Sequence, residues 1–265
     1  LCDAGALVAI VDEALAPVFD SIGQEVESLR EVLVVGDGTS TRRSFSTLCA
    51  ASPAIPSAPV DPEAPAVILY STGFREGLPR GVLHTHRTPL ASFETYARGV
   101  LAMTAGDRVF SAVKLATSYG LGAGLVFPLA AGAETVLLPA QPRSDAVLGV
   151  LGSLGPTILF ATPSLYGQLL DDLTASGAPN PDQPDGRMFD SLRACVSGAE
   201  AMPSALASRL AACLQVEVMA GYGLSEAFHF VIATPPGQAR AGSSGVVVPG
   251  YQARVIGEDG RAVGV

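Results

Sequence analysis

Short apolar runs alternate with amphipathic segments along almost the whole chain. Runs rich in Val, Ile, Leu and Ala have the length and bounding residues of buried strands at residues 6–11, 31–35, 66–70, 108–113, 134–138, 157–160, 193–197 and 216–219. Apolar residues recur at helical spacing in segments 87–102, 144–154, 164–173 and 203–214. Continuous apolar strands joined by helices indicate parallel sheets covered on both faces. The pattern therefore predicts an α/β fold.

Two stretches interrupt this alternation and are predicted to be loops. Residues 49–65 are rich in Ala, Ser and Pro, and residues 175–187 are rich in Pro, Asp and Gly. The first loop is long enough to connect two subdomains, which divides the chain into 1–60 and 61–265. Residues 258–265 predict a hairpin turn followed by the start of its second strand.

Composition narrows the class of protein. A chain of 265 residues with 48% hydrophobic content buries a large core, and no apolar run reaches the roughly 18 residues of a membrane span. A net charge of -9 with only 16 Lys and Arg argues against a nucleic-acid surface. The four cysteines lack CxxC spacing, so neither a zinc site nor a disulfide scaffold is expected. We expect an acidic enzyme of the reducing cytoplasm, without membrane or nucleic-acid partners.

The first residues contain no initiator methionine, no basic segment and no cleavage signature. We therefore expect the chain to begin inside a longer protein.

A glycine-rich stretch follows the apolar run at 66–70. Residues 70–81 read Tyr-Ser-Thr-Gly-Phe-Arg-Glu-Gly-Leu-Pro-Arg-Gly. Glycines expose successive backbone N–H groups and permit close approach, so the stretch suits phosphate oxygens. It is not the common phosphate loop, because Pro79 and Arg80 stand where that signature needs other residues. The alternative is a Gly/Pro-rich surface turn after a strand.

A second motif follows the apolar run at 216–219. Residues 220–229 read Ala-Gly-Tyr-Gly-Leu-Ser-Glu-Ala-Phe-His. The carboxylate of Glu226 is the ligand type that a hard cation such as Mg²⁺ prefers. The alternative, which is compatible with the first, is a glycine turn in which Ser225 caps a helix.

Both motifs resemble those of the adenylate-forming enzymes, the acyl-CoA synthetase and AMP-binding superfamily. The loop keeps the family's frame but carries Phe74-Arg75-Glu76 in place of two hydroxyl residues, and Arg80 in place of lysine. The resemblance implies that the ring of Tyr222 packs on adenine, that Ser225 meets the α-phosphate, and that Glu226 holds Mg²⁺. It also implies an adenine pocket in segment 192–203. The implied nucleotide-binding residues are Ser71, Thr72, Gly73, Gly77, Arg80, Ser197, Gly198, Ala199, Glu200, Gly221, Tyr222 and Gly223, with Ser225 and Glu226 as catalytic residues.

Within the superfamily the chain is most similar to benzoate-CoA ligases and related aryl-CoA ligases. The resemblance is carried by Lys114-Leu115, the segments 119–122, 127–129 and 160–166, and by His229 three places after Glu226. It implies that Tyr119, Gly120 and His229 surround a flat aromatic acid. Two alternatives stay open: the glycines at 120–124 begin a tightly packed helix, and His229 is a core histidine. His84 and His86 have the spacing of a metal pair on a strand but no third ligand, and we interpret them as structural.

The resemblance implies that this chain is the central part of a large N-terminal domain. Its full-length relatives activate a carboxylate with ATP and Mg²⁺ to an acyl-adenylate and pass the acyl group to CoA or a carrier-protein thiol; a homodimer is compatible with this reading. The family's ribose-binding aspartate and lysine-bearing C-terminal domain lie outside these residues, so little activity is expected of them alone. The alternative is a degenerate, non-catalytic adenylation-like binding or scaffold protein, which Phe74-Arg75-Glu76 favour and Glu226 disfavours.

Overall fold

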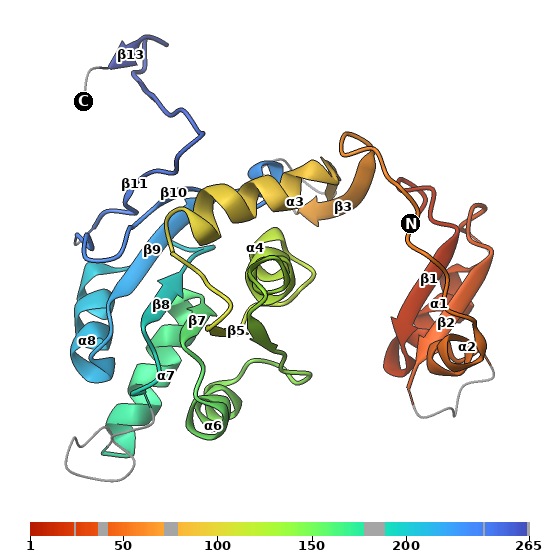
Figure 1. Cartoon of the computed structure of the whole chain (residues 1–265), viewed down its shortest axis with the longest axis horizontal. Coiled ribbons are helices and arrows are strands. Elements are labelled where there is room, and N and C mark those ends of the chain that lie inside the picture. Colours follow the sequence, from red (N-terminus) through yellow and green to blue (C-terminus); the bar gives the residue numbers. More distant parts are fainter. Residues whose placement is uncertain (24, 37–41, 72–78, 178–188, 241, 264–265) are drawn as a thin grey trace. The chain divides into compact units, whose positions relative to one another are not determined.

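The computed structural model describes residues 1–23, 25–36, 42–71, 79–177, 189–240 and 242–263. The chain forms two compact units, Leu1–Asp61 and Pro62–Val265 (Figure 1).

The first unit is a small β-α-β layer. Its strands are parallel, with Val8 opposite Glu31, and alternate residues of each strand are buried. The buried face packs with the first helix into a core formed by Ala9, Val11, Ala16, Val32 and Val34. The elements are β1 (Val8–Asp12), η1 (Glu13–Leu15), α1 (Ala16–Ile22), β2 (Glu31–Val35) and α2 (Phe45–Ala51).

The second unit is built on a seven-stranded sheet in the order β11-β10-β9-β8-β7-β5-β6. The strands from β6 to β9 are parallel, whereas β10 and β11 are antiparallel. The strands of this sheet are β5 (Arg108–Ser111), β6 (Glu134–Val136), β7 (Ile158–Ala161), β8 (Ala194–Ser197), β9 (Val218–Gly223), β10 (Phe230–Ala233) and β11 (Val246–Val247). Two antiparallel hairpins complete the unit, β3 (Pro65–Ser71) with β4 (Arg80–Thr85), and β12 (Val255–Ile256) with β13 (Ala262–Val263).

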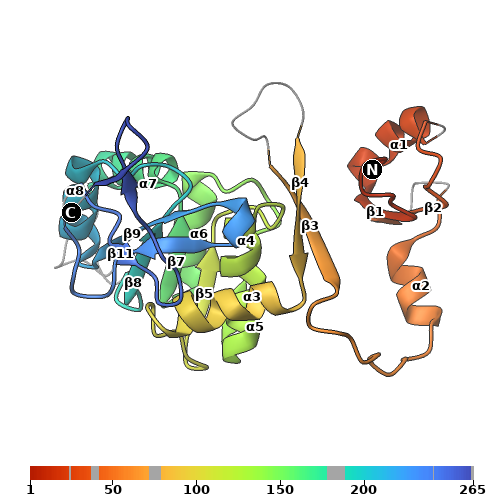
Figure 2. The ribbon, with the colours of Figure 1, turned by 90° about the horizontal axis from the view of Figure 1, so that it is seen from above.

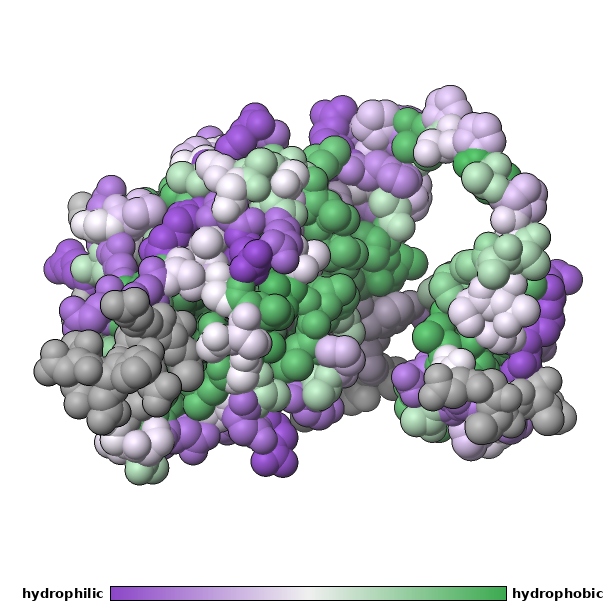
Figure 3. All heavy atoms as spheres, turned by 60° about the horizontal axis from the view of Figure 1, so that its bottom comes forward, coloured by the Kyte–Doolittle hydropathy of each residue, from purple (hydrophilic) through white to green (hydrophobic). Residues whose placement is uncertain are grey.

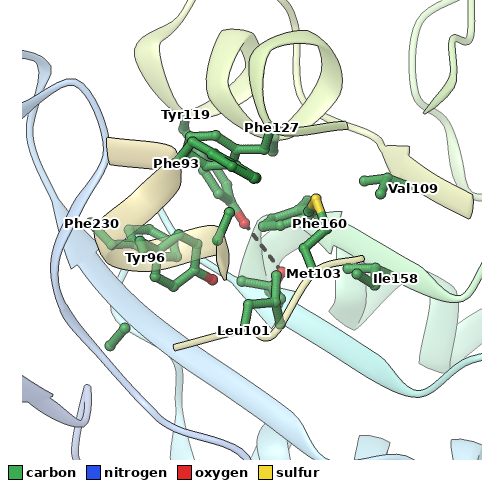
Figure 4. Packing of buried hydrophobic residues seen from close by; sticks show 14 of the residues in the cluster. Phe93, Tyr96, Leu101, Met103, Val109, Tyr119, Phe127, Ile158, Phe160 and Phe230 are labelled. Atoms are coloured by element: carbon green, nitrogen blue, oxygen red, sulfur yellow. Dashed lines mark hydrogen bonds between the residues drawn. The ribbon is translucent and has the colours of Figure 1, made fainter. Parts of the chain in front are cut away.

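Helices cover both faces of the large sheet (Figures 1 and 2). One face packs against α6 (Ser144–Leu154), α7 (Pro163–Ala175) and α8 (Ser204–Leu214). The other face packs against two groups of shorter helices, which form the aromatic core of Figure 4. These are α3 (Arg87–Ser92) with the π-helix η2 (Phe93–Arg98), and α4 (Ser118–Leu121) with the π-helix η3 (Gly122–Val126) and α5 (Phe127–Ala131). The predicted α/β fold with helices on both faces is confirmed.

Three details differ from the sequence prediction. The helix predicted over 87–102 ends at Arg98, because the chain turns at Gly99 to bury Leu101 and Met103. The strand predicted over 216–219 extends to Gly223, because the unpredicted strand β10 pairs with its second half, Gly221 lying opposite Ala233. The helices α1 and α2 were not predicted, whereas the helices over 118–131 confirm the alternative in which the glycines at 120–124 begin a tightly packed helix. The hairpin predicted at 258–265 is confirmed by the pairing of β12 with β13.

The amino ends of β5, β7 and β8 are joined by a polar network around Asp107. The Nε and Nη2 atoms of Arg193 donate to its two carboxylate oxygens at 2.7 and 2.9 Å. The Thr157 hydroxyl and the Thr104 backbone N–H donate to the same carboxylate, each at 2.8 Å. Burial raises the pKa of Asp107, but these hydrogen bonds and the guanidinium charge outweigh it and lower the pKa to about 2.

Apolar side chains also reach the surface of the second unit, as the green areas of Figure 3 show. Exposed examples are Leu90, Leu129 and Leu137. Among the described residues, no helix combines the length and the apolar character needed to cross a membrane.

Candidate functional site

The predicted adenine-pocket segment and the Gly-Tyr-Gly motif lie side by side at the carboxyl ends of β8 and β9. The two strands are parallel neighbours, with Ser197 opposite Ala220. Gly198 and Gly221 directly follow this pair, so the two predicted segments meet at one edge of the sheet. Ligands of α/β proteins commonly bind at this edge.

An aromatic side chain lies against these glycines. A Cβ atom added to Gly198 would lie 2.6 Å from Cζ of Phe230, and one added to Gly221 would lie 2.3 Å from Cδ2 of the same ring. The small residues were expected to admit a flat base, and the flat group that touches them is the Phe230 side chain. Sequence reasoning missed Phe230, although an aromatic residue directly after His229 was a usable signal.

Tyr119 is fixed at the same edge by its hydroxyl group. Thr117 caps the helix by accepting a hydrogen bond from the Gly120 N–H. The single hydroxyl proton of Tyr119 is shared between the Val196 carbonyl at 3.1 Å and the Ala161 carbonyl at 3.3 Å, so it bridges β7 and β8. Figure 4 shows the Tyr119 ring within the aromatic core. Burial raises the pKa of this hydroxyl well above its ordinary value, which keeps it a donor.

His229 lies in a cage of aromatic rings and is only 2% exposed. The Tyr96 ring stacks on it at 5.0 Å between centroids, and the Phe127 and Phe230 rings lie at 4.6 and 4.4 Å. Neither imidazole nitrogen meets a hydrogen-bond partner of good geometry among the residues that the structure describes. Burial lowers the pKa of His229 to about 3, although the nearby Tyr119 backbone opposes that shift. The imidazole is therefore neutral at pH 7.

The glycines near Tyr119 have different neighbours. A Cβ atom at Gly122 would lie 2.7 Å from Cδ2 of His229, so this glycine makes room for the imidazole ring. A Cβ atom at Gly120 would lie 2.0 Å from the Lys114 carbonyl oxygen. The small size of Gly120 therefore serves the packing of α4 against the backbone. The structure brings Tyr119 and His229 together, with ring centroids 5.4 Å apart.

Ser225 and Glu226 lie in the short 3₁₀ helix η5 (Ser225–Ala227). The alternative in which Ser225 caps a helix is wrong, since the cap position is Leu224 and no side chain caps this turn. Glu226 is exposed. Phe228 follows with a positive φ of 67° and a fully buried ring, so the turn ends in a strained conformation held by packing.

The remaining predicted residues lie around these two groups. Tyr222, on β9, is 53% exposed. Ser197 is buried at the end of β8, and its hydroxyl lies 3.6 Å from Sδ of Met202. Ala199 has a positive φ of 69°. Glu200 accepts a hydrogen bond from the Ser164 hydroxyl at 2.5 Å.

The predicted phosphate loop joins β3 to β4. Ser71 and Arg80 are paired across this hairpin, directly at the ends of the loop. Thr72, Gly73 and Gly77 lie outside the described residues, as do Phe74-Arg75-Glu76.

Glu226 is the only residue proposed as a metal ligand. Among the described residues, no group of three or more His, Cys, Asp or Glu side chains is arranged to hold a metal ion. A single carboxylate nevertheless fits Mg²⁺, which is typically held by one or two carboxylates together with water and substrate phosphates.

Comparison with known proteins identifies the family. A family model described as AMP-binding enzyme matches residues 1–265. This chain belongs to the AMP-binding enzymes. The benzoate-CoA ligase of Thauera aromatica is 38% identical over 264 residues, which are 99% of this chain and 48% of that protein. The 4-hydroxybenzoate-CoA/benzoate-CoA ligase of Rhodopseudomonas palustris is 31% identical, over 98% of this chain and 47% of that protein.

A solved relative extends the match to structure. An anthranilate-CoA ligase in complex with anthranoyl-AMP superposes with a TM-score of 0.89 at 31% identity, over 100% of this chain and 50% of that one. The predicted membership of the superfamily and the resemblance to aryl-CoA ligases are confirmed. The chain spans about half the length of the curated relatives it matches.

Proposed function

We propose that this chain forms the nucleotide- and acid-binding region of an AMP-binding enzyme that activates a benzoate-like aromatic acid. In that reaction a carboxylate oxygen bonds to the α-phosphorus of ATP and pyrophosphate leaves. A thiol then bonds to the acyl carbon and AMP leaves, and CoA is the proposed thiol. The identities to benzoate-CoA and hydroxybenzoate-CoA ligases support this assignment.

The observation that carries the proposal is the buried, neutral His229 within a cage of aromatic rings. Buried polar groups in folded proteins are nearly always hydrogen-bonded, yet neither nitrogen of this imidazole meets a partner of good hydrogen-bond geometry within the described part of the chain. One nitrogen of a neutral imidazole donates a hydrogen bond. An aromatic acid beside Tyr119 and Phe230 would place its ring against aromatic neighbours and its carboxylate within reach of that donor.

The nucleotide is proposed to bind at the adjoining strand ends. Gly198 and Gly221 have no side chains to keep a flat group from the backbone of β8 and β9, and the Tyr222 ring is exposed on β9. A base in this place requires a different position of the Phe230 ring, which now contacts both glycines. Glu226 would hold Mg²⁺, which neutralises charge on the phosphates as pyrophosphate leaves.

Calorimetric titration of the purified chain tests this proposal. We expect saturable binding of ATP in the presence of Mg²⁺, and of benzoate more tightly than hexanoate, because the cage is aromatic. His229→Leu should weaken benzoate binding more than ATP binding, and His86→Leu, at an exposed histidine, is the matched control. Tighter binding of hexanoate than of benzoate, or no binding of ATP, would overturn the proposal.

A second candidate function is a binding protein without turnover. It is favoured by Phe74-Arg75-Glu76, which replace two neutral hydroxyl donors and place a carboxylate in the proposed phosphate loop. If the loop is a weak phosphate clamp, replacing the three residues with Thr-Thr should tighten ATP binding by about 1–3 kcal/mol. If Arg75 binds phosphate, the same change should weaken ATP binding. Exchange of labelled pyrophosphate into ATP, measured with and without benzoate, separates turnover from binding alone.

A further inference from the structure

The hairpin β3–β4 and the turn Ser225–Ala227 meet at one buried histidine. His84 lies on β4 and is 3% exposed. Its Nε2 atom lies 2.8 Å from the backbone carbonyl oxygen of Ser225, which is 141 residues away along the chain. A carbonyl oxygen only accepts hydrogen bonds, so this geometry requires the His84 tautomer that carries its proton on Nε2.

The same carbonyl oxygen closes the turn from the other side. The backbone N–H of Phe228 donates to it at 3.1 Å. Two donors therefore converge on one acceptor, and one of them belongs to a residue with a positive φ of 67°. Such a conformation persists only where its surroundings hold it in place.

Packing reinforces this contact. The imidazole ring of His84 meets the Phe228 ring edge to face, with 5.3 Å between centroids and 85° between the planes. The Phe228 ring is fully buried. His84 therefore contacts Ser225 through a hydrogen bond and Phe228 through its ring. These two residues flank Glu226 and Ala227.

We propose that His84 is a positioning residue that fixes the Ser225–Ala227 turn, and with it the Glu226 carboxylate, to the β3–β4 hairpin. This inference rests on the proposed function, in which the hairpin and the turn bind the same nucleotide. The register of the hairpin sets Ser71 opposite Arg80, and His84 lies four residues further along the same strand. One hairpin therefore carries both Ser71 and Arg80, at the ends of the predicted phosphate loop, and His84, the support for the proposed metal ligand.

Substitutions at His84 test the role. His84→Leu removes the donor and fills its place with an apolar side chain, whereas His84→Gln keeps an N–H donor. His86→Leu is the matched control, because His86 lies two residues away and is exposed.

The first measurement is amide hydrogen exchange across residues 224–228 of the ligand-free protein. His84→Leu should speed exchange there by about tenfold, because the partly buried Ser225 carbonyl loses one of its two donors. His84→Gln should restore most of the protection, and His86→Leu should change nothing. Unchanged exchange in a folded His84→Leu variant would overturn the proposal.

The second measurement is the factor by which Mg²⁺ strengthens ATP binding. We expect His84→Leu to reduce this factor by about tenfold, with a smaller effect on ATP alone and none on benzoate. A merely structural role would lower all three affinities together, and that result would count against positioning. If the wild-type chain binds no ATP, the proposed function fails, while the exchange measurement still decides whether His84 holds the turn.

A third measurement needs no substitution. The ¹⁵N spectrum of the histidine side chains should show His84 as the Nε2–H tautomer with a slowly exchanging proton. If His84 instead carries its proton on Nδ1 alone, it donates nothing to Ser225 and the proposal is wrong.

Discussion

The amino and carboxyl ends of the large sheet in the second unit are built in opposite ways. At the amino ends of the strands, Asp107 is 6% exposed and is paired with Arg193, Thr157 and Thr104. At the carboxyl ends, His229 is 2% exposed, yet neither of its nitrogens has a partner of good hydrogen-bond geometry within the described residues. Both groups have a lowered pKa, but for opposite reasons. Hydrogen bonds stabilise the charged form of Asp107, whereas burial removes the charged form of His229.

This difference assigns folding stability to the amino ends of the strands and ligand binding to their carboxyl ends. A fully satisfied polar network fixes the strands to one another and leaves little for a ligand to add. An unsatisfied polar group costs stability unless a ligand supplies the missing partner. The positive φ angles of Ala199 and Phe228, beside the proposed nucleotide site, are consistent with the same division. The account predicts that changes at the amino end act on folding, and changes at the carboxyl end act on ligands.

The largest effect is expected at the amino end. Asp107→Asn should lower the free energy of unfolding by about 2–4 kcal/mol, because it breaks a buried pair whose arginine is partly exposed. Urea denaturation measures this change. The folded variant should bind benzoate and ATP as the wild type does; altered affinity in the folded state would show that the two ends are not separate.

Glu226→Gln should give the reverse result. The variant should lose about 1.5–3 kcal/mol of the Mg²⁺-dependent part of ATP binding, since an interaction with a charged group is removed. Its free energy of unfolding should change by less than about 0.5 kcal/mol, because the side chain is exposed. Calorimetry with and without Mg²⁺, beside urea denaturation, measures both. An unchanged Mg²⁺ effect would remove Glu226 from the metal site.

Acidification should lower the free energy of unfolding, because the pKa of His229 is lower in the folded protein than in the unfolded chain. The pKa is about 3 in the folded protein and 6.5 ordinarily. Between these values the unfolded chain binds a proton that the folded protein does not, so stability falls as the pH falls. The slope should be about 1.4 kcal/mol per pH unit, or about 2 kcal/mol between pH 7 and 5.

His229→Leu should remove this part of the pH dependence. Asp107 should contribute only below about pH 5, where its carboxylate becomes protonated in the unfolded chain, with an ordinary pKa of 3.8, but stays ionised in the folded protein down to about pH 2. Urea denaturation of both proteins at pH 7, 6 and 5 gives the comparison. Equal slopes for the wild type and the variant would mean that His229 is protonated in the folded state.

The smallest effect is expected for Tyr119→Phe. The variant keeps the ring beside His229 but loses a hydroxyl shared by two carbonyls, one of which also accepts from Tyr166. We expect a loss of about 0.5–1.5 kcal/mol in the free energy of unfolding and little change in benzoate affinity. A large loss of benzoate binding would mean that the hydroxyl itself contacts the acid.

Sequence patterns predicted the helices and strands that are determined by their own residues and not by distant contacts. The strand at 31–35 and the helix at 144–154 have the predicted bounds, because a β-rich run and a helical apolar face are local signals. The glycines at 120–124 are poor helix formers, and their helix is held by packing of Gly122 against His229 and of Gly120 against the Lys114 backbone. Strand β10 was missed because it is a run of only four residues whose pairing with β9 is not a local signal.

The residue types of the candidate site were accessible from motifs, but their arrangement was not. The contact of His84 with Ser225 joins residues 141 positions apart, and the pairing of Arg193 with Asp107 joins residues 86 positions apart. No local pattern encodes such pairs. Likewise, the sequence identified small residues at Gly198 and Gly221 but gave no sign that the Phe230 ring lies against them.

The most direct test of the central claim is a chemical-shift map of the isotope-labelled chain with a non-hydrolysable benzoyl-AMP analogue. The account predicts that the perturbed amides cluster at Gly198, Gly221 to Glu226, and His229, with the amides around Asp107 and Arg193 unchanged. The His229 side-chain nitrogens should also shift as one of them gains a partner. No binding, or perturbations centred on the amino ends of the strands, would contradict the assignment of the binding site to the carboxyl ends.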